Sequence, residues 1–252
     1  MPPIRVIARL DVKGPNVVKG IHLEGLRVVG KPDDFSRRYY AQGTDEIVYM
    51  DIVASLYGRN NILSVVEAAA HEVFVPLTVG GGIRTVDDIV AALRSGADKV
   101  AINTAAIARP EFLREAAKAF GSQCIVLSVE AKRREGGWWE ALTDNGREKT
   151  GVNVLDWVVE AERLGAGEIL VTSVDNEGTR KGFDLDLMEE VYRRVRIPVI
   201  ACGGAGGPED VADLLSRRRT DAVCCASVFH YDLCSVPQLK KNLKERGYEV
   251  RI

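Results

Sequence analysis

FVPLTVGGGIRTVDDIVAALRSGADKVAINTAAI, residues 74–107, and RIPVIACGGAGGPEDVADLLSRRRTDAVCCASVFH, residues 196–230, follow one pattern. Each runs from an apolar segment through a glycine cluster to a helical pattern, and then to a second strand rich in small residues. Pro76 matches Pro198 and Gly82 matches Gly204, separated both times by about half of the 252 residues. Upstream, GTDEIVYMD matches GAGEILVTS and VIARLD matches IVLSVE. The chain is therefore two copies of one half-length unit.

Each copy contains four short apolar runs, and continuous apolar runs suit parallel strands that are covered on both faces. The runs lie near residues 4–10, 46–52, 75–79, 98–103, 124–130, 168–173, 197–202 and 221–226. Helical patterns such as VLDWVVEAERLGAG separate them. Eight strands alternating with eight helices predict an α/β fold, a (β/α)8 TIM barrel built from two repeated half-barrels. A doubly wound open sheet is the main alternative, but the repeat favours closure because each half covers the other's edges.

Composition limits the class of protein. We expect one domain over residues 1–252, with half-barrels of about 1–122 and 123–252, because no Pro/Ser-rich linker separates them. The net charge of −2 indicates no dedicated nucleic-acid surface. No apolar run approaches the ~18 residues that span a membrane. The odd number of five cysteines without metal spacing favours reduced thiols in the cytoplasm, and we expect neither a metal nor a cofactor.

Glycine clusters end the third and seventh predicted strands, and small polar residues end the fourth and eighth. Glycine lets backbone N–H groups approach an anion closely, and helix N-termini add positive potential. Alternatively, the glycines only turn the chain. Because the repeat places the feature on both sides of one mouth, we predict two phosphate sites and a ligand with a phosphate at each end. The first site comprises Gly82, Asn103 and Thr104, and the second comprises Gly178, Gly204 and Ser227.

Two carboxylates occupy equivalent places in the repeat. Asp11 ends the first predicted strand and Glu130 ends the fifth, so both should point into the mouth between the phosphate sites. A paired acid and base can move protons in a ring closure or a sugar rearrangement. We therefore predict Asp11 and Glu130 as catalytic groups. Alternatively, such carboxylates cap a loop or pair with Lys132 or Arg9. After the fifth strand, an Asn145-Gly146 turn predicts a hairpin.

Several motifs together carry a family resemblance: RLDVKGPNVVKG, DEIVYMDIVAS, PLTVGGGIRT, GADKVAINTAA, FGSQCIVLSVEAKR, TDNGREKTG, GAGEILVTSVDNEGTRKGFD and IACGGAGG. Over nearly its whole length the chain resembles the HisF family, the cyclase subunits of imidazole glycerol phosphate synthase. The resemblance implies a heterodimer with a HisH-like glutaminase, whose ammonia passes through the barrel. At the top, ammonia would react with the bis-phosphorylated intermediate PRFAR to give imidazole glycerol phosphate and AICAR.

The resemblance also implies roles for individual residues. Asp11 resembles one of two catalytic aspartates, and Lys19 resembles the lysine of a mobile loop that closes on substrate. The positions that match an ammonia gate at the bottom of the barrel are Arg5, Glu46, Lys99 and Glu168. Asp98 and Gln123 match positions that face the glutaminase. For the gate, salt bridging that only stabilises the barrel bottom is an open alternative.

The chain departs from the family pattern at four positions. Glu130 and Glu177 replace aspartates, Arg9 replaces a common cysteine, and Cys202 replaces a serine. Arg9 could pair with Glu130 and silence it, or bind a further anionic group. These departures keep a second hypothesis open: a paralogue that channels ammonia with a glutaminase to a sugar-amidating enzyme of surface-polysaccharide biosynthesis. A third, the sister isomerase of the same pathway, is disfavoured by the gate pattern and FGSQ.

Overall fold

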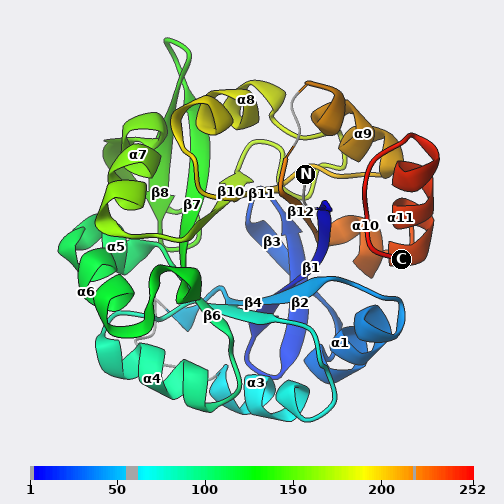
Figure 1. Cartoon of the computed structure of the whole chain (residues 1–252), viewed down its shortest axis with the longest axis horizontal. Helices are drawn as coiled ribbons and strands as arrows, with labels where there is room; N and C mark the ends of the chain where they lie inside the picture. Colours follow the sequence, from blue (N-terminus) through cyan, green and yellow to red (C-terminus); the bar gives the residue numbers. More distant parts are fainter. Residues whose placement is uncertain (1–2, 55–61, 218–219) are drawn as a thin grey trace.

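Eight parallel strands close into a barrel in the computed structural model, which describes residues 3–54, 62–217 and 220–252 (Figure 1). Their order around the barrel is β1 (Arg5–Lys13), β4 (Glu46–Asp51), β5 (Leu77–Gly80), β6 (Lys99–Ile102), β7 (Ile125–Arg134), β10 (Glu168–Ser173), β11 (Val199–Cys202) and β12 (Ala222–Cys225). Strand β12 pairs in parallel with β1, which closes the ring. The predicted (β/α)8 barrel is confirmed, and the open sheet is excluded.

The two halves of the barrel repeat one strand register. Asp11 in β1 lies opposite Met50 in β4, and Glu130 in β7 lies opposite Thr172 in β10. Strands β5 and β11 then continue each half in the same parallel sense. The two carboxylates therefore sit at equivalent heights, as the sequence repeat indicates.

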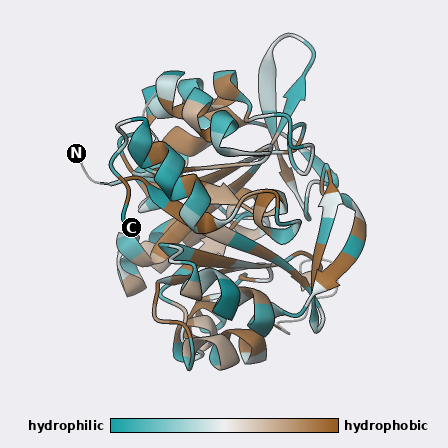
Figure 2. Ribbon diagram, turned by 90° about the vertical axis from the view of Figure 1, so that its right-hand side faces the viewer, coloured by the Kyte–Doolittle hydropathy of each residue, from teal (hydrophilic) through white to brown (hydrophobic). Residues whose placement is uncertain are grey.

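Helices cover the outside of the barrel (Figures 1 and 2). Those in the described residues are α1 (Pro32–Ala41), α3 (Leu63–Ala70), α4 (Val86–Arg94), α5 (Thr104–Ala108), α6 (Glu111–Phe120), the short 3₁₀ helix η1 (Ser122–Cys124), α7 (Val154–Leu164), α8 (Leu185–Arg194), α9 (Pro208–Arg217), α10 (Ser227–His230) and α11 (Val236–Glu245). In α7, the apolar residues at helical spacing are buried and Asn153 caps the first turn. Gly165, with a left-handed φ of 109°, ends the helix.

Buried apolar side chains form two layers. The larger layer lies between the strands and the helices and includes Leu10, Tyr49 and Phe112. A smaller cluster, which includes Val48 and Leu170, fills the inside of the barrel. The charged side chains of the candidate sites lie toward the two ends of the barrel, on either side of this cluster.

Two hairpins extend the sheet beyond the carboxyl ends of β1 and β7, again at repeat-equivalent places. The first consists of β2 (Asn16–Ile21) and β3 (Glu24–Gly30), and the second of β8 (Trp138–Thr143) and β9 (Glu148–Asn153). The turn of the second includes Asn145 and Gly146, both at positive φ, so the predicted hairpin is confirmed. The first replaces the loop that was expected after the first strand: β2 and β3 pair antiparallel, although β3 is largely exposed and the pairing is irregular.

No helix among the described residues is long and apolar enough to cross a membrane.

Candidate active site at the carboxyl ends of the strands

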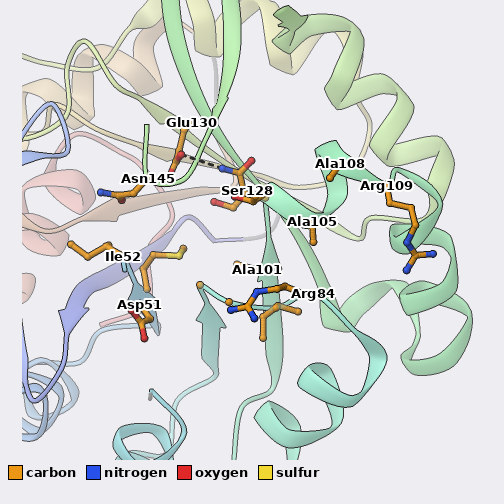
Figure 3. A pocket seen from close by; sticks show the side chains of 16 residues that line it. Asp51, Ile52, Arg84, Ala101, Ala105, Ala108, Arg109, Ser128, Glu130 and Asn145 are labelled. Carbon is orange, nitrogen blue, oxygen red and sulfur yellow. Dashed lines mark hydrogen bonds between the residues drawn. The ribbon is translucent and has the colours of Figure 1, made fainter. Parts of the chain in front are cut away.

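An open cavity of about 370 Å³ lies at the carboxyl ends of β5, β6 and β7 (Figure 3). Gly82, Asn103 and Thr104, predicted as the first phosphate site, all line it. A Cβ on the neighbouring Gly81 would lie 2.1 Å from the carbonyl oxygen of Asp51, so only glycine fits this turn. The structure thus brings the first set together around a cavity large enough for part of a small ligand.

Glu130 borders this cavity and points toward Asn103 from β7 (Figure 3). Its Oε2 accepts hydrogen bonds from the backbone N–H of Gly146, at 2.8 Å, and from the side-chain amide of Asn103, at 3.1 Å. Burial raises the pKa of the carboxyl group to about 7, although the Gly146 hydrogen bond acts in the opposite direction. A carboxyl group of this kind exchanges a proton near neutral pH.

Asp11 has a different environment. Arg9 Nε donates to its Oδ1 at 2.7 Å, and Lys19 Nζ donates to its Oδ2 at 3.2 Å. The carboxylate is buried, and burial alone would raise its pKa, but Arg9 and Lys19 outweigh burial and lower the pKa to about 2. Of the pairings left open for Arg9, the structure shows the one with Asp11 and not the one with Glu130. Lys132, the other expected partner, pairs with Asp175 at 2.5 Å.

The β2–β3 hairpin folds over the other side of the mouth. Lys19 of β2 is buried and forms an ion pair with Glu177, which follows β10. The other oxygen of Glu177 accepts the backbone N–H of Leu23 at 2.9 Å, and its carbonyl accepts the N–H of His22 at 2.9 Å. Glu177 therefore fastens the hairpin to the loop after β10 through both its side chain and its backbone.

The second set of predicted phosphate residues lies beneath this hairpin. Gly178, Gly204 and Ser227 line one cavity together with Arg9 and Lys19, but its volume is only about 20 Å³. That space is of the order of one or two water-sized probes, so it holds no phosphate as it stands. The sequence repeat predicted two equivalent sites, whereas the structure has one wide cavity and one narrow cavity.

Cys202 and Thr172 complete the surroundings of Arg9. Its Nη1 donates to Thr172 Oγ1 at 3.0 Å and lies 3.7 Å from Cys202 Sγ. A hydrogen bond from Cys224 lowers the pKa of the Cys202 thiol to about 6, with Arg9 contributing in the same direction. The sequence indicated Arg9 as a possible partner of the two carboxylates of the site, and the alternation of side chains along a strand places residues two apart on one face. It gave no signal for the contacts of Arg9 with Thr172 and Cys202, which lie on distant strands.

A ring of four charges closes the opposite end of the barrel. Arg5, Glu46, Lys99 and Glu168 are each the first residue of a strand. Arg5 bonds Glu46 at 2.6 Å and also pairs with Glu168, and Lys99 Nζ contacts the two glutamates at 3.0 and 2.9 Å. The structure thus assembles all four predicted gate residues into an alternating, neutral ring.

Asp98 and Gln123, predicted to face a partner, are both exposed. Asp98 directly precedes β6 and accepts the N–H of Leu77 at 2.8 Å, while Gln123 lies in η1, just before β7. Both therefore sit at the amino ends of the strands, the end opposite to the two cavities.

Comparison with known proteins places the chain among biosynthetic enzymes. Residues 5–235 match the model of a family described as "Histidine biosynthesis protein". The imidazole glycerol phosphate synthase subunit HisF of Legionella pneumophila is 61% identical over 210 residues, which cover 83% of this chain and 99% of that protein. Proteins of the same name from Corynebacterium diphtheriae and Dehalococcoides mccartyi (strain BAV1) are 48% and 47% identical, with 98% of each chain covered in both cases.

Proposed function

The chain belongs to the histidine biosynthesis protein family and, within it, to the HisF subunits, and from this premise we propose that it is the cyclase subunit of imidazole glycerol phosphate synthase. It uses ammonia to convert PRFAR to imidazole glycerol phosphate and AICAR in histidine biosynthesis. One observation carries the proposal most directly. Asp11 and Glu130 occupy equivalent strand positions in one mouth, between two glycine-lined cavities.

The substrate is bis-phosphorylated, and the two cavities are its proposed end sites. Gly82, Asn103 and Thr104 bind one phosphate group in the open cavity. The second set, Gly178, Gly204 and Ser227, binds the other after the β2–β3 hairpin lifts. Lys19 and Arg9 border that second cavity, each already paired with a carboxylate, so a phosphate there would compete with Asp11 and Glu177 for them.

The ring closure moves protons between the ammonia nitrogen and the departing atom of the substrate, and carboxyl groups are suited to this. Glu130 lines the first cavity, Asp11 is bonded to Arg9 and Lys19, which line the second, and both carboxyl groups are buried from bulk water. A site that excludes water strengthens every charge interaction with the substrate. We therefore assign the two carboxyl groups to the reacting centre and Lys19 to the closure of the mouth over it.

Ammonia enters at the other end, and the partner is a HisH-like glutaminase that forms a heterodimer with this chain. The ring of Arg5, Glu46, Lys99 and Glu168 is the proposed gate, because its alternating charges can separate around a narrow polar passage. Asp98 and Gln123 are proposed to contact the glutaminase. Their exposure at the same end of the barrel supports this assignment.

The proposal is tested by assaying the purified chain with PRFAR and ammonium ions. We expect formation of imidazole glycerol phosphate, and a decrease in kcat of roughly 100-fold or more in D11N, which loses a negative charge at the reacting centre, and in E130Q, which loses a proton-transferring group. E135Q, an exposed glutamate in the hairpin that follows Glu130, is the matched control and should retain wild-type turnover. Turnover by the wild type that does not exceed that of D11N would contradict the proposal.

A second function is favoured by one observation: Arg9 is paired with Asp11, and the second cavity is too narrow for a phosphate. In this alternative the barrel conducts ammonia from a glutaminase to a sugar-amidating enzyme of surface-polysaccharide biosynthesis and does not cyclise PRFAR. The same assay separates the two. A glutaminase complex that hydrolyses glutamine and releases ammonia, but leaves PRFAR unconsumed, supports the conduit.

We also propose a single domain over residues 1–252 and a cytoplasmic location. Pairings β6–β7 and β12–β1 join the two half-barrels, so each half supplies strands that cover the edges of the other. All five cysteines are free thiols, which suits a reducing compartment.

A further inference from the structure

Both carboxylate oxygens of Asp11 already accept a bond from a cation. Arg9 Nε lies 2.7 Å from Oδ1, and Lys19 Nζ lies 3.2 Å from Oδ2. Asp11, Arg9 and Lys19 are each at most 4% exposed, so water does not screen these interactions. Charge-assisted bonds of this kind strongly favour the ionised carboxylate, because protonation would leave two buried cations with a weakened partner.

Arg9 is itself held in place across the inside of the barrel. It lies two residues before Asp11 on β1, so both side chains point to the same face of the strand. Its Nη1 donates to Thr172 Oγ1 on β10 at 3.0 Å and lies near Cys202 on β11. Arg9 belongs to β1 and contacts β10 and β11, so its side chain is held in one position inside the barrel.

Glu130 has no such partner among the described residues. The bonds that these residues donate to its side chain, from Gly146 and Asn103, both end on Oε2 and come from uncharged groups. Oε1 is left for a ligand in the open cavity, which Glu130 lines. The charged groups that face it are Arg9 on β1, which favours its ionised form, and Asp11 and Asp144, which oppose it.

On the basis of the proposed function, we infer that Arg9 is a positioning residue that holds Asp11 as a fixed anion and leaves proton exchange with the substrate to Glu130. As the ammonia nitrogen forms a bond to a carbonyl carbon of the substrate and the C=O π bond breaks, the Glu130 carboxylate accepts a proton from that nitrogen, becomes the carboxylic acid, and delivers the proton to the former carbonyl oxygen. It ends the cycle as a carboxylate, so no proton is gained or lost. Asp11 keeps its charge throughout and stabilises the positive charge that develops on the nitrogen.

The first test is the pH dependence of kcat/KM for PRFAR with ammonium ions. The wild type should show one ionisation from the site near pH 7, which E130Q removes. Arg9→Met keeps much of the side-chain length but removes the charge, so Lys19 alone opposes the effect of burial at Asp11 and the pKa of Asp11 should rise. We expect a second, acidic ionisation in R9M and a decrease in kcat of about tenfold or more. R9K, the conservative control, should keep the single ionisation.

The second test needs no activity. Carboxyl carbons of Asp and Glu, labelled with ¹³C, are followed by NMR from pH 3 to pH 9, with D11N and E130Q used to assign the two signals. We expect Glu130 to titrate near neutral pH while Asp11 in the wild type stays ionised over the whole range. In R9M, the Asp11 signal should begin to titrate.

The outcomes of the two tests are distinct. Asp11 titrating alongside Glu130 in the wild type, or an R9M profile identical to that of the wild type, would overturn the inference. The wild-type titration decides the point even if R9M does not fold. If the NMR titrations are as expected but the wild type consumes no PRFAR, the proposed function fails while the role of Arg9 stands.

Discussion

Glu130 and Asp11 show how neighbours decide what a buried carboxyl group does. Both are side chains of barrel strands at equivalent register, and burial opposes the ionisation of both. Asp11 receives bonds from two cations, whereas Glu130 receives them from a backbone N–H and an amide. Neutral donors compensate less of the desolvation of a charge than cations do. One carboxyl group is thereby held ionised, and the other stays close to half-protonated at neutral pH.

The raised pKa of Glu130 has a consequence for stability. Its pKa is about 7 in the folded chain against an ordinary value of 4.5, so the folded state binds more protons between these two pH values. The free energy of unfolding should therefore decrease as pH rises from about 4.5 to 7, by roughly 3 kcal/mol in total. The lowered pKa of Asp11 acts below its ordinary value of 3.8 and lies outside this window.

Urea unfolding at pH 5 and pH 8 measures this effect. E130Q cannot ionise at this position, so its stability should fall by about 3 kcal/mol less than that of the wild type between the two pH values. The exposed E67Q on α3 serves as the control and should keep the wild-type difference. Equal pH dependence in E130Q and the wild type would show that Glu130 ionises normally in the folded chain.

At the scale of elements, the β2–β3 hairpin depends on Glu177. One carboxylate holds Lys19 and the N–H of Leu23, and the hairpin in turn covers the second cavity. Glycines line the cavity beneath the hairpin. Only glycine fits at Gly178, because a Cβ there would lie 2.3 Å from the carbonyl oxygen of Gly20 in the hairpin. Close backbone approach and a buried ion pair thus hold one hairpin down.

Replacing Glu177 by glutamine should release this hairpin. The change removes the charge that pairs with Lys19 and leaves that cation buried, and a hydrogen bond to a charged group contributes about 1.5–3 kcal/mol. Amide hydrogens of residues 16–30 should exchange roughly tenfold faster or more, while those of α7 remain unchanged. E24Q, an exposed glutamate on β3, is the matched control. Unchanged exchange in E177Q would mean that other contacts hold the hairpin closed.

At the scale of the whole molecule, the barrel separates two polar ends by an apolar interior. The charge ring lies at the amino ends of the strands, and the carboxyl groups lie at the other. The apolar cluster that includes Val48 and Leu170 lies inside the barrel. This arrangement suits a molecule that receives a small neutral compound at one end and uses it at the other.

Lys99→Met tests the ring. Without the ammonium group, Glu46 and Glu168 share Arg5 alone, and the free energy of unfolding should decrease by about 1–3 kcal/mol, less than for a fully buried pair because Lys99 is partly exposed. In the glutaminase complex, the ratio of glutamine-dependent to ammonium-dependent turnover should also fall. The exposed K118M on α6 is the control for both measurements. An unchanged ratio would leave the ring with a stabilising role only.

The sequence predicted the parts of this molecule that depend on repetition and local pattern. The match between GTDEIVYMD and GAGEILVTS placed the strands, and periodicity and Gly165 placed α7. The Asn145-Gly146 turn predicted the second hairpin. The repeat predicted the residues that line the cavities at the carboxyl ends of the strands, and the family resemblance implied the residues of the charge ring.

What the sequence did not predict depends on contacts between segments that are far apart in the chain. The bond between Lys19 and Glu177 joins two loops whose approach is set only by the closed barrel. The same holds for Arg9, which bonds Thr172 on the opposite half. Nor does the repeat indicate that one cavity is wide and its mate narrow.

Because the two cavities differ in volume, the two phosphate ends of a ligand should bind one after the other. One end of the ligand would bind first in the wide cavity, and the other end would bind only after the β2–β3 hairpin over the narrow cavity opens. The observed rate of ligand binding would then level off at high ligand concentration, where it equals the rate at which the hairpin opens. The duplicated barrel would therefore bind the two ends of its ligand in a fixed order.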